Sequence, residues 1–226
     1  MIRYICIILF SFFAALSFFS APSHAQKVPL AMSETETDLA ARKVSADVYL
    51  LRGFGNVFSR GLDEMSAKLQ KQGVPAKVAH HSEWKNIADQ IAANRRKFGR
   101  RPVVLIGHSL GANAVLRMAQ ELRKKRITVQ YMATFAATAP PPVPSNVRKL
   151  TNYYFKTDGW GKPIAKGKGF RGNLKNIDFS KSKTIGHFNI DKQPRLQRQV
   201  IRNVLRFVKG SKRANAEQTD DTLLPG

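Results

Sequence analysis

The stretch VVLIGHSLG, residues 103–111, joins an apolar run directly to a serine flanked by glycines. Four consecutive apolar residues at 103–106 are typical of a central parallel strand that is buried on both faces. The Ala-rich segment that follows, Ala112 to Lys125, favours a helix. Glycines suit the junction because bulkier side chains would collide in a sharp strand-to-helix turn. The stretch therefore predicts a strand, a tight turn that projects Ser109, and a helix.

Short β-rich runs alternate with longer amphipathic runs on both sides of this unit, a pattern typical of parallel strands joined by crossover helices. The predicted strands are Asp47 to Leu51, Ala76 to His80, Pro102 to Gly107, Val129 to Phe135, Leu150 to Lys156 and Leu174 to Phe179. The predicted helices are Val57 to Gln72, Glu83 to Phe98, Ala112 to Lys125 and Pro194 to Val208. We therefore expect an α/β fold, a mostly parallel sheet flanked by helices, in a single domain over residues 44–209.

Composition excludes several functional classes and indicates an anionic partner. The only cysteine, Cys6, lies in the N-terminal apolar stretch, which argues against a disulfide scaffold, a Cys-based zinc site and a Cys nucleophile. Thirty-eight Lys and Arg residues against fifteen Asp and Glu residues give a formal net charge of +23. Such a charge bears on partners and solubility and leaves the fold undetermined.

The composition of the two ends of the chain predicts that they lie outside the folded domain. Residues 1–25 combine a basic start, an apolar run and the small residues Ser23-His24-Ala25, which together predict a cleaved signal peptide and export to the periplasm or medium. The alternative is an uncleaved membrane anchor, although the apolar run is short for a spanning helix. Residues 26–43 are predicted to form a flexible leader, and residues 210–226 a disordered tail.

The G-x-S-x-G motif at a strand-to-helix junction resembles the nucleophile elbow of the α/β-hydrolase superfamily, which includes serine esterases, lipases and thioesterases. The resemblance implies a catalytic serine, then an acid, then a histidine in chain order. It covers about residues 44–208. Where many relatives insert a cap domain, between Phe135 and Leu150, this chain has only a short loop with four prolines, so a capless enzyme is expected.

The resemblance implies Ser109 as nucleophile and His187 as general base, since His187 is the only histidine after Ser109. Asp158 is the preferred acid because it follows a predicted strand at its carboxyl end, where α/β sheets place catalytic groups. Asp178 remains the alternative acid. Asp191 is expected to cap the final helix instead.

The resemblance also implies an oxyanion hole, formed by the backbone N–H of Leu110 and a second N–H from the loop after the first strand. That loop reads Arg52-Gly53-Phe54-Gly55-Asn56 and lacks the HG or HGGG form common in lipases. Phe54 and Gly55 therefore both remain candidates for the second donor.

These features predict an exported serine hydrolase that cleaves a small-molecule or lipid ester, or a thioester, without a metal or other cofactor. The alternative is an exported cationic binding protein on an inactive hydrolase scaffold. No nucleic-acid motif accompanies the charge, so nucleic acid is not an expected partner. Four cations in the loop after Asp158 are candidates for binding an anionic substrate or the cell-envelope surface: Lys162, Lys166, Lys168 and Arg171.

Overall fold

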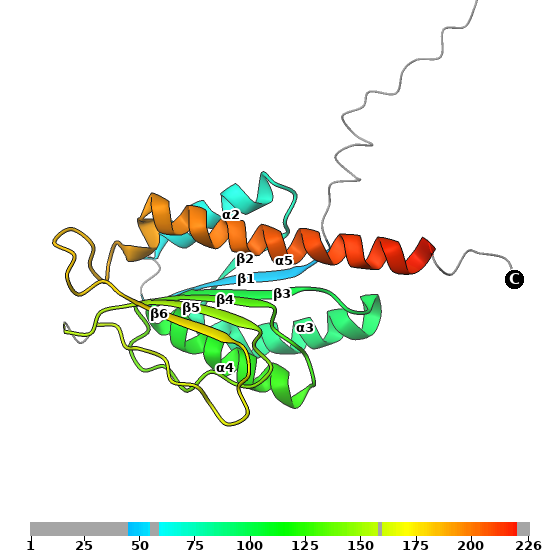
Figure 1. Cartoon of the computed structure of the whole chain (residues 1–226), viewed down its shortest axis with the longest axis horizontal. Coiled ribbons are helices and arrows are strands. Elements are labelled where there is room, and N and C mark those ends of the chain that lie inside the picture. The colour runs from blue at the N-terminus through cyan, green and yellow to red at the C-terminus, as the bar shows by residue number, and fades with distance from the viewer. Residues whose placement is uncertain (1–44, 55–58, 158–159, 221–226) are drawn as a thin grey trace, which may run out of the picture. The chain divides into compact units, whose positions relative to one another are not determined.

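Six parallel strands form one sheet, in the order β2-β1-β3-β4-β5-β6, in the computed structural model (Figure 1). The model describes residues 45–54, 59–157 and 160–220, with side chains as far as Gly210. The strands are β1 (Asp47–Arg52), β2 (Ala76–His80), β3 (Val103–His108), β4 (Tyr131–Phe135), β5 (Lys149–Tyr154) and β6 (Asn173–Asp178). The predicted signal peptide and the predicted leader both lie outside the described residues.

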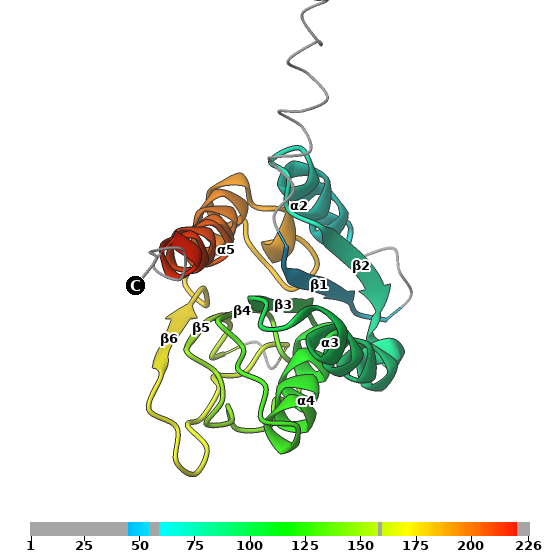
Figure 2. The same ribbon diagram turned by 90° about the vertical axis from the view of Figure 1, so that its right-hand side faces the viewer.

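Helices cover both faces of the sheet. Within the described ranges they are α2 (Arg60–Gln70), α3 (Trp84–Phe98), α4 (Leu110–Lys124) and α5 (Pro194–Asp220), with short 3₁₀ turns η1 (His81–Glu83) and η2 (Ile190–Lys192). Figure 2 shows α2 and α5 on one face of the sheet and α3 and α4 on the other. None of the helices in the described ranges is long and apolar enough to cross a bilayer.

The apolar run at the start of β3 is buried on both faces, as its sequence predicts. Its alternate residues enter two different cores: Ile106 packs with α2 and α5, and Leu105 packs with α3 and α4. Four apolar residues spaced four apart on the last helix are buried in the first of these cores: Leu196, Val200, Val204 and Val208. The α/β fold class is confirmed, with every strand pair parallel.

Apart from the end of α5, strand and helix bounds agree with the sequence prediction to within a few residues. α4 begins at Leu110 because Ser109 already caps it, so the turn passes into the helix without a linker. β4 begins at Tyr131 because Val129 forms only an isolated bridge to Val147. The backbone of α5 continues as helix to Asp220, beyond residue 209 where the sequence predicts the folded unit to end.

The strand order places a switch point between β1 and β3. From β1 the chain moves outward to β2, and it then returns past β1 to add β3 on the other side. In open α/β sheets the carboxyl ends of strands at such a point diverge to leave room for a ligand or a catalytic group. The loop after β1 and the turn after β3 meet there.

Candidate active site

Ser109 lies in a strained turn between β3 and α4. Its φ of 57° and ψ of −121° fall in a region that residues with a side chain rarely occupy. Neighbouring hydrogen bonds hold this conformation: Ser109 N donates to Phe135 O at the end of β4, and Ser109 O accepts from Ala112 N, the latter at 3.0 Å. The turn thus projects the serine side chain at the carboxyl edge of the sheet.

The motif glycines permit this turn because the backbone is packed tightly around it. A Cβ on Gly107 would lie 2.3 Å from the Gly111 carbonyl oxygen, and one on Gly111 would lie 1.9 Å from the Leu51 carbonyl oxygen. The loop after β1 comes equally close, since a Cβ on Gly53 would lie 2.9 Å from the Ser109 Cβ. Any side chain at Gly107 or Gly111 would push α4 away from β1 and β3.

His187 lies beside Ser109 although 78 residues separate them. Its Nε2 is 3.1 Å from the Ser109 Oγ, and its Nδ1 is 2.5 Å from the Trp160 carbonyl oxygen. A carbonyl oxygen only accepts hydrogen bonds, so Nδ1 carries the proton and Nε2 presents a lone pair to the serine hydroxyl. This tautomer suits an imidazole that removes a proton from Ser109.

A second histidine, His108, links three loops beneath this pair. The Gly53 N–H donates to the Ser59 Oγ, which lies 2.8 Å from the His108 Nδ1, and the His108 Nε2 lies 2.8 Å from the His187 carbonyl oxygen. Burial lowers the pKa of His108 to about 4, so its ring is neutral near pH 7. The sequence alone gives no sign of this role, because His108 occupies a variable position of the G-x-S-x-G motif.

Of the two candidate acids, only Asp178 is among the described residues. Asp158, the acid preferred from sequence, lies outside them, two residues before Trp160. Asp178 is exposed at the end of β6, and its Oδ1 accepts from the Ser180 hydroxyl and from the backbone N–H groups of Ser180 and Lys156. The Ser180 hydroxyl and N–H hydrogen bonds hold the pKa of Asp178 below its ordinary value.

Asp191 corrects one sequence expectation. Its carboxylate was expected to cap the last helix, but its Oδ2 accepts from the Gly61 N–H, 3.0 Å away in the first turn of α2. The side chain is fully buried, and burial raises its pKa from 3.8 to about 7. Asp191 therefore ties the 3₁₀ turn η2, just after the His187 loop, to the helix that follows the β1 loop.

The structure covers part of the expected oxyanion hole. Leu110 is the first residue of α4, and the opening N–H groups of a helix have no partner within it. Phe54 ends the described part of the β1 loop and is 76% exposed, whereas Gly55 lies outside the described residues. The N–H of Leu110 and the β1 loop both border Ser109.

Exposed aromatic side chains surround the Ser109–His187 pair. Trp160 is 57% exposed and Phe188 is 51% exposed, and their rings lie 5.3 Å and 5.0 Å from the His187 ring, centroid to centroid. Phe54 joins them from the β1 loop. Exposed apolar side chains therefore border the His187 ring.

The four cations after Asp158 do not gather at this surface. The Lys162 N–H donates to Ala137 O, and Lys166 forms a bridge with Val143 in the proline loop. Arg171 precedes Gly172, which packs against the carbonyl groups of Val147 and Arg148 before β5 begins. Residues 162–172 thus run from the carboxyl edge of the sheet back to its opposite end. Of the four cations, Lys162 is the one closest to Trp160 along the chain.

Comparison with known proteins agrees with this architecture. The family model of the thioesterase domain matches residues 62–152, from α2 to β5. The chain has an α/β-hydrolase-like fold. The match supports a hydrolase of esters or thioesters. No curated protein matches the sequence.

Within the described ranges, no group of three or more His, Cys, Asp or Glu side chains is placed to hold a metal ion.

Three solved structures resemble the chain at low identity. A candidate hydrolase of the alpha/beta superfamily from Xanthomonas campestris pv. campestris is 13% identical, with a TM-score of 0.39, covering 74% of this chain and 98% of its own. The type II thioesterase BorB of the borrelidin biosynthetic cluster is 12% identical, with a TM-score of 0.47 and coverages of 72% and 92%. The thioesterase domain SrfTE, which cyclises the lipopeptide antibiotic surfactin, is 12% identical, with a TM-score of 0.36 and coverages of 58% and 80%.

Proposed function

We propose that this protein is a serine hydrolase that cleaves a carboxylic ester or thioester through an acyl-enzyme on Ser109. The observation that carries the proposal is the 3.1 Å approach of the His187 Nε2 to the Ser109 Oγ, with the Nδ1 proton held by the Trp160 carbonyl. A serine hydroxyl is a weak nucleophile until a positioned base removes its proton. His187 is oriented to be that base.

In the first half of the reaction, the Ser109 Oγ attacks the substrate carbonyl carbon while its proton passes to the His187 Nε2. The carbonyl oxygen becomes an oxyanion, which the Leu110 N–H and a second N–H from Phe54 or Gly55 stabilise. The intermediate then collapses, the bond to the alcohol or thiol breaks, and the leaving group takes the proton from Nε2. The acyl group remains on Ser109.

In the second half, His187 removes a proton from water, and the resulting hydroxide attacks the acyl carbon. Collapse of this second intermediate releases the carboxylic acid and returns the proton to Ser109. Asp158 is assigned the third role, that of stabilising the His187 imidazolium in both halves. Its place two residues before Trp160, whose carbonyl bonds the His187 Nδ1, favours it over Asp178, whose carboxylate bonds Ser180 and the Lys156 backbone.

The aromatic surface around Ser109 favours apolar acyl groups. Phe54, Trp160 and Phe188 offer apolar area to a substrate tail that leads to the serine. The β4–β5 connection contains no helix that would cover this surface. Open access suits acyl chains presented by a larger carrier or surface as well as small esters.

The direct test is labelling with a fluorophosphonate probe, which phosphonylates only an activated serine. We expect the wild-type protein to be labelled and the Ser109→Ala variant to remain unlabelled. Ser59→Ala is the comparison: it removes another buried serine hydroxyl near the site but leaves Ser109 and His187 in place, so it should still be labelled, although more slowly than the wild-type protein. Labelling of Ser109→Ala, or none of the wild-type protein, would contradict the proposal and favour a binding protein on an inactive scaffold.

We propose in addition that the protein is exported and that residues 1–25 are removed. The basic start, the apolar run and the small residues ending at Ala25 support this proposal. Mass spectrometry of the protein recovered from the cell envelope should give an N-terminus at Gln26. Recovery of residues 1–25 within the intact chain would instead support a membrane anchor.

A further inference from the structure

An open groove of about 980 Å³ lies between α5 and the first halves of β5 and β6. One wall is helical, from Gln199 to Gly210, and the other is formed by Lys149 and Thr151 of β5 with Asn173 and Lys175 of β6. The groove is at the opposite end of the sheet from Ser109, because all strands are parallel and Ser109 follows the carboxyl end of β3. It is therefore separate from the proposed active site.

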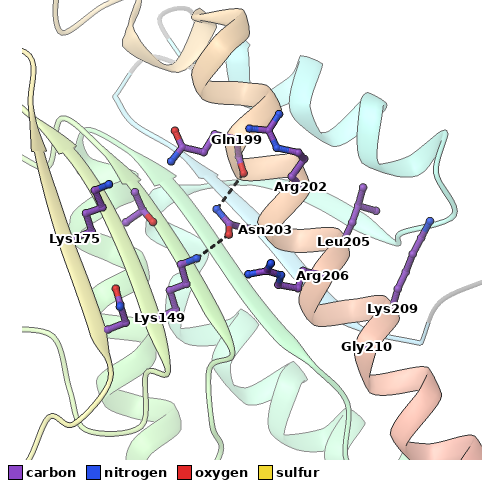
Figure 3. Close-up of a pocket in the computed structure, with 11 residues that line it drawn as sticks. Lys149, Lys175, Gln199, Arg202, Asn203, Leu205, Arg206, Lys209 and Gly210 are labelled. Carbon is purple, nitrogen blue, oxygen red and sulfur yellow. Dashed lines mark hydrogen bonds between the residues drawn. The ribbon is translucent and has the colours of Figure 1, made fainter.

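Five cations line this groove, and its lining contains no acid: Lys149, Lys175, Arg202, Arg206 and Lys209. Among the described residues, no carboxylate lies within ion-pair distance of any of them. Figure 3 shows Lys149 extending from β5 towards the helix and Arg206 extending from α5 towards the strands. Burial, Arg206 and Lys175 together lower the pKa of Lys149. Within residues 45–54, 59–157 and 160–210, the charge of this groove is therefore not compensated.

Lys149 is held in place at the base of the groove. Its Nζ donates to the Asn203 Oδ1 at 2.8 Å, and Asn203 in turn donates to the Gln199 carbonyl oxygen at 3.1 Å. The ammonium also lies 5.9 Å from the centre of the Tyr131 ring. An ammonium has three N–H donors, so two remain for a ligand. The site for at least one anionic group is therefore already positioned.

The spacing of the other cations indicates more than one anionic group. Arg202 and Arg206 stand one turn apart on α5, about 6 Å along its axis, and Lys175 faces them from β6. Guanidinium groups bind phosphate oxygens through two parallel N–H donors. Among the residues whose side chains the structure describes, none that lines the groove is aromatic, so they offer no platform on which nucleic-acid bases would stack.

We infer that this groove binds two or more phosphate groups at once, either those of a free oligophosphate or those of neighbouring anionic lipid headgroups on a membrane surface. Lys149, Lys175 and Arg206 would contact the phosphate oxygens directly. Arg202 and Lys209 would extend the cationic surface along α5.

The test compares two double variants that remove the same charge. Lys175→Gln/Arg206→Gln removes two groove cations, and Arg95→Gln/Arg96→Gln removes two from the last turn of α3, on the other face of the sheet. Lys149 is left intact because its hydrogen bond to Asn203 supports the fold. Binding of tripolyphosphate is measured by calorimetry, and binding to phosphatidylglycerol and phosphatidylcholine vesicles by sedimentation. Ester hydrolysis by both variants reports on the integrity of the fold.

We expect the groove variant to weaken binding at least about tenfold, since it loses two charge-assisted hydrogen bonds, while the α3 variant changes it less than about twofold. Loss with both tripolyphosphate and phosphatidylglycerol vesicles identifies the shared phosphate chemistry. Loss with vesicles alone assigns the ligand to the lipid headgroup. Equal weakening of binding in the two variants would show that only the net charge of the protein matters, and it would overturn the inference. Wild-type protein that binds neither probe would also overturn it.

Discussion

The two ends of the sheet differ in how they hold their functional groups. At the carboxyl edge, Ser109 and His187 are fixed by backbone hydrogen bonds and surrounded by aromatic side chains. In the α5 groove, five cations line an open surface, and of these only Lys149 makes a side-chain hydrogen bond among the described residues. Bond-making chemistry needs atoms placed within fractions of an ångström, whereas attraction of a polyanion needs mainly charge density. Five cations of this chain therefore gather at the end of the sheet away from its serine.

The largest expected effect is on kcat, and it should arise at the carboxyl edge of the sheet and not in the α5 groove. His187→Ala removes the base beside Ser109 and should lower kcat for ester hydrolysis by about 10⁴-fold or more. Lys175→Gln/Arg206→Gln should leave kcat unchanged, because its residues lie at the other end of the strands. Steady-state kinetics with an aryl ester measure both. Equal losses in the two variants would show that the ends are coupled.

The next effect tests which acid serves His187. Asp158→Asn should lower kcat by about 10²- to 10³-fold, less than in triads where the acid alone fixes the tautomer, because the Trp160 carbonyl already holds the Nδ1 proton. Asp178→Asn should change kcat less than about threefold, since its carboxylate bonds Ser180 and the Lys156 backbone. If Asp178→Asn proves the more damaging change, the acid comes from β6.

A smaller effect is expected from the support beneath the site. His108→Leu removes the hydrogen bonds to Ser59 and to the His187 carbonyl. We expect kcat to fall about 10- to 100-fold through misplacement of His187, with KM little changed. Ser59→Ala keeps the hydrogen bond between His108 and the His187 carbonyl, so its kcat should fall by less. A wild-type kcat in His108→Leu would show that the His187 loop is held by other contacts.

The aromatic surface should affect substrate choice rather than chemistry. Phe188→Ala should lower kcat/KM for an octanoyl ester about three- to tenfold and leave that for an acetyl ester unchanged, since only the long chain reaches the apolar surface. Phe98→Ala is a matched control, because Phe98 is also 51% exposed but lies at the end of α3. Equal losses for both esters would place Phe188 outside the acyl path.

The smallest effect concerns stability against pH. Asp191 has a folded-state pKa of about 7 and an ordinary value of 3.8, so the folded protein holds this proton more tightly than the unfolded chain does. The contribution is complete below pH 4 and is lost as pH rises through 7. Between pH 4 and pH 8, wild-type protein should lose at least about 1 kcal/mol more unfolding free energy than Asp191→Asn. Urea denaturation at both pH values measures this difference, and parallel losses would contradict it.

Much of the site followed from local sequence. The apolar run of β3 and the glycines around Ser109 encode a buried strand and a tight turn, because strand burial and backbone clearance depend on nearby residues. His187 was identified as the only histidine after the serine. The buried face of α5 can also be predicted from the sequence, because residues four apart lie on one face of a helix.

Tertiary structure decided the contacts between distant segments. The Trp160 carbonyl that fixes His187 and the His108 link beneath it join residues whose side-chain types gave no signal for such contacts. Asp191 bonds α2 rather than α5 because the packing of η2 brings it to Gly61, 130 residues away. The groove likewise combines arginines of α5 with lysines from two strands. Sequence determined each element and its exposed face; only the crossover packing of the sheet determined which faces meet, because that depends on contacts summed over the whole core.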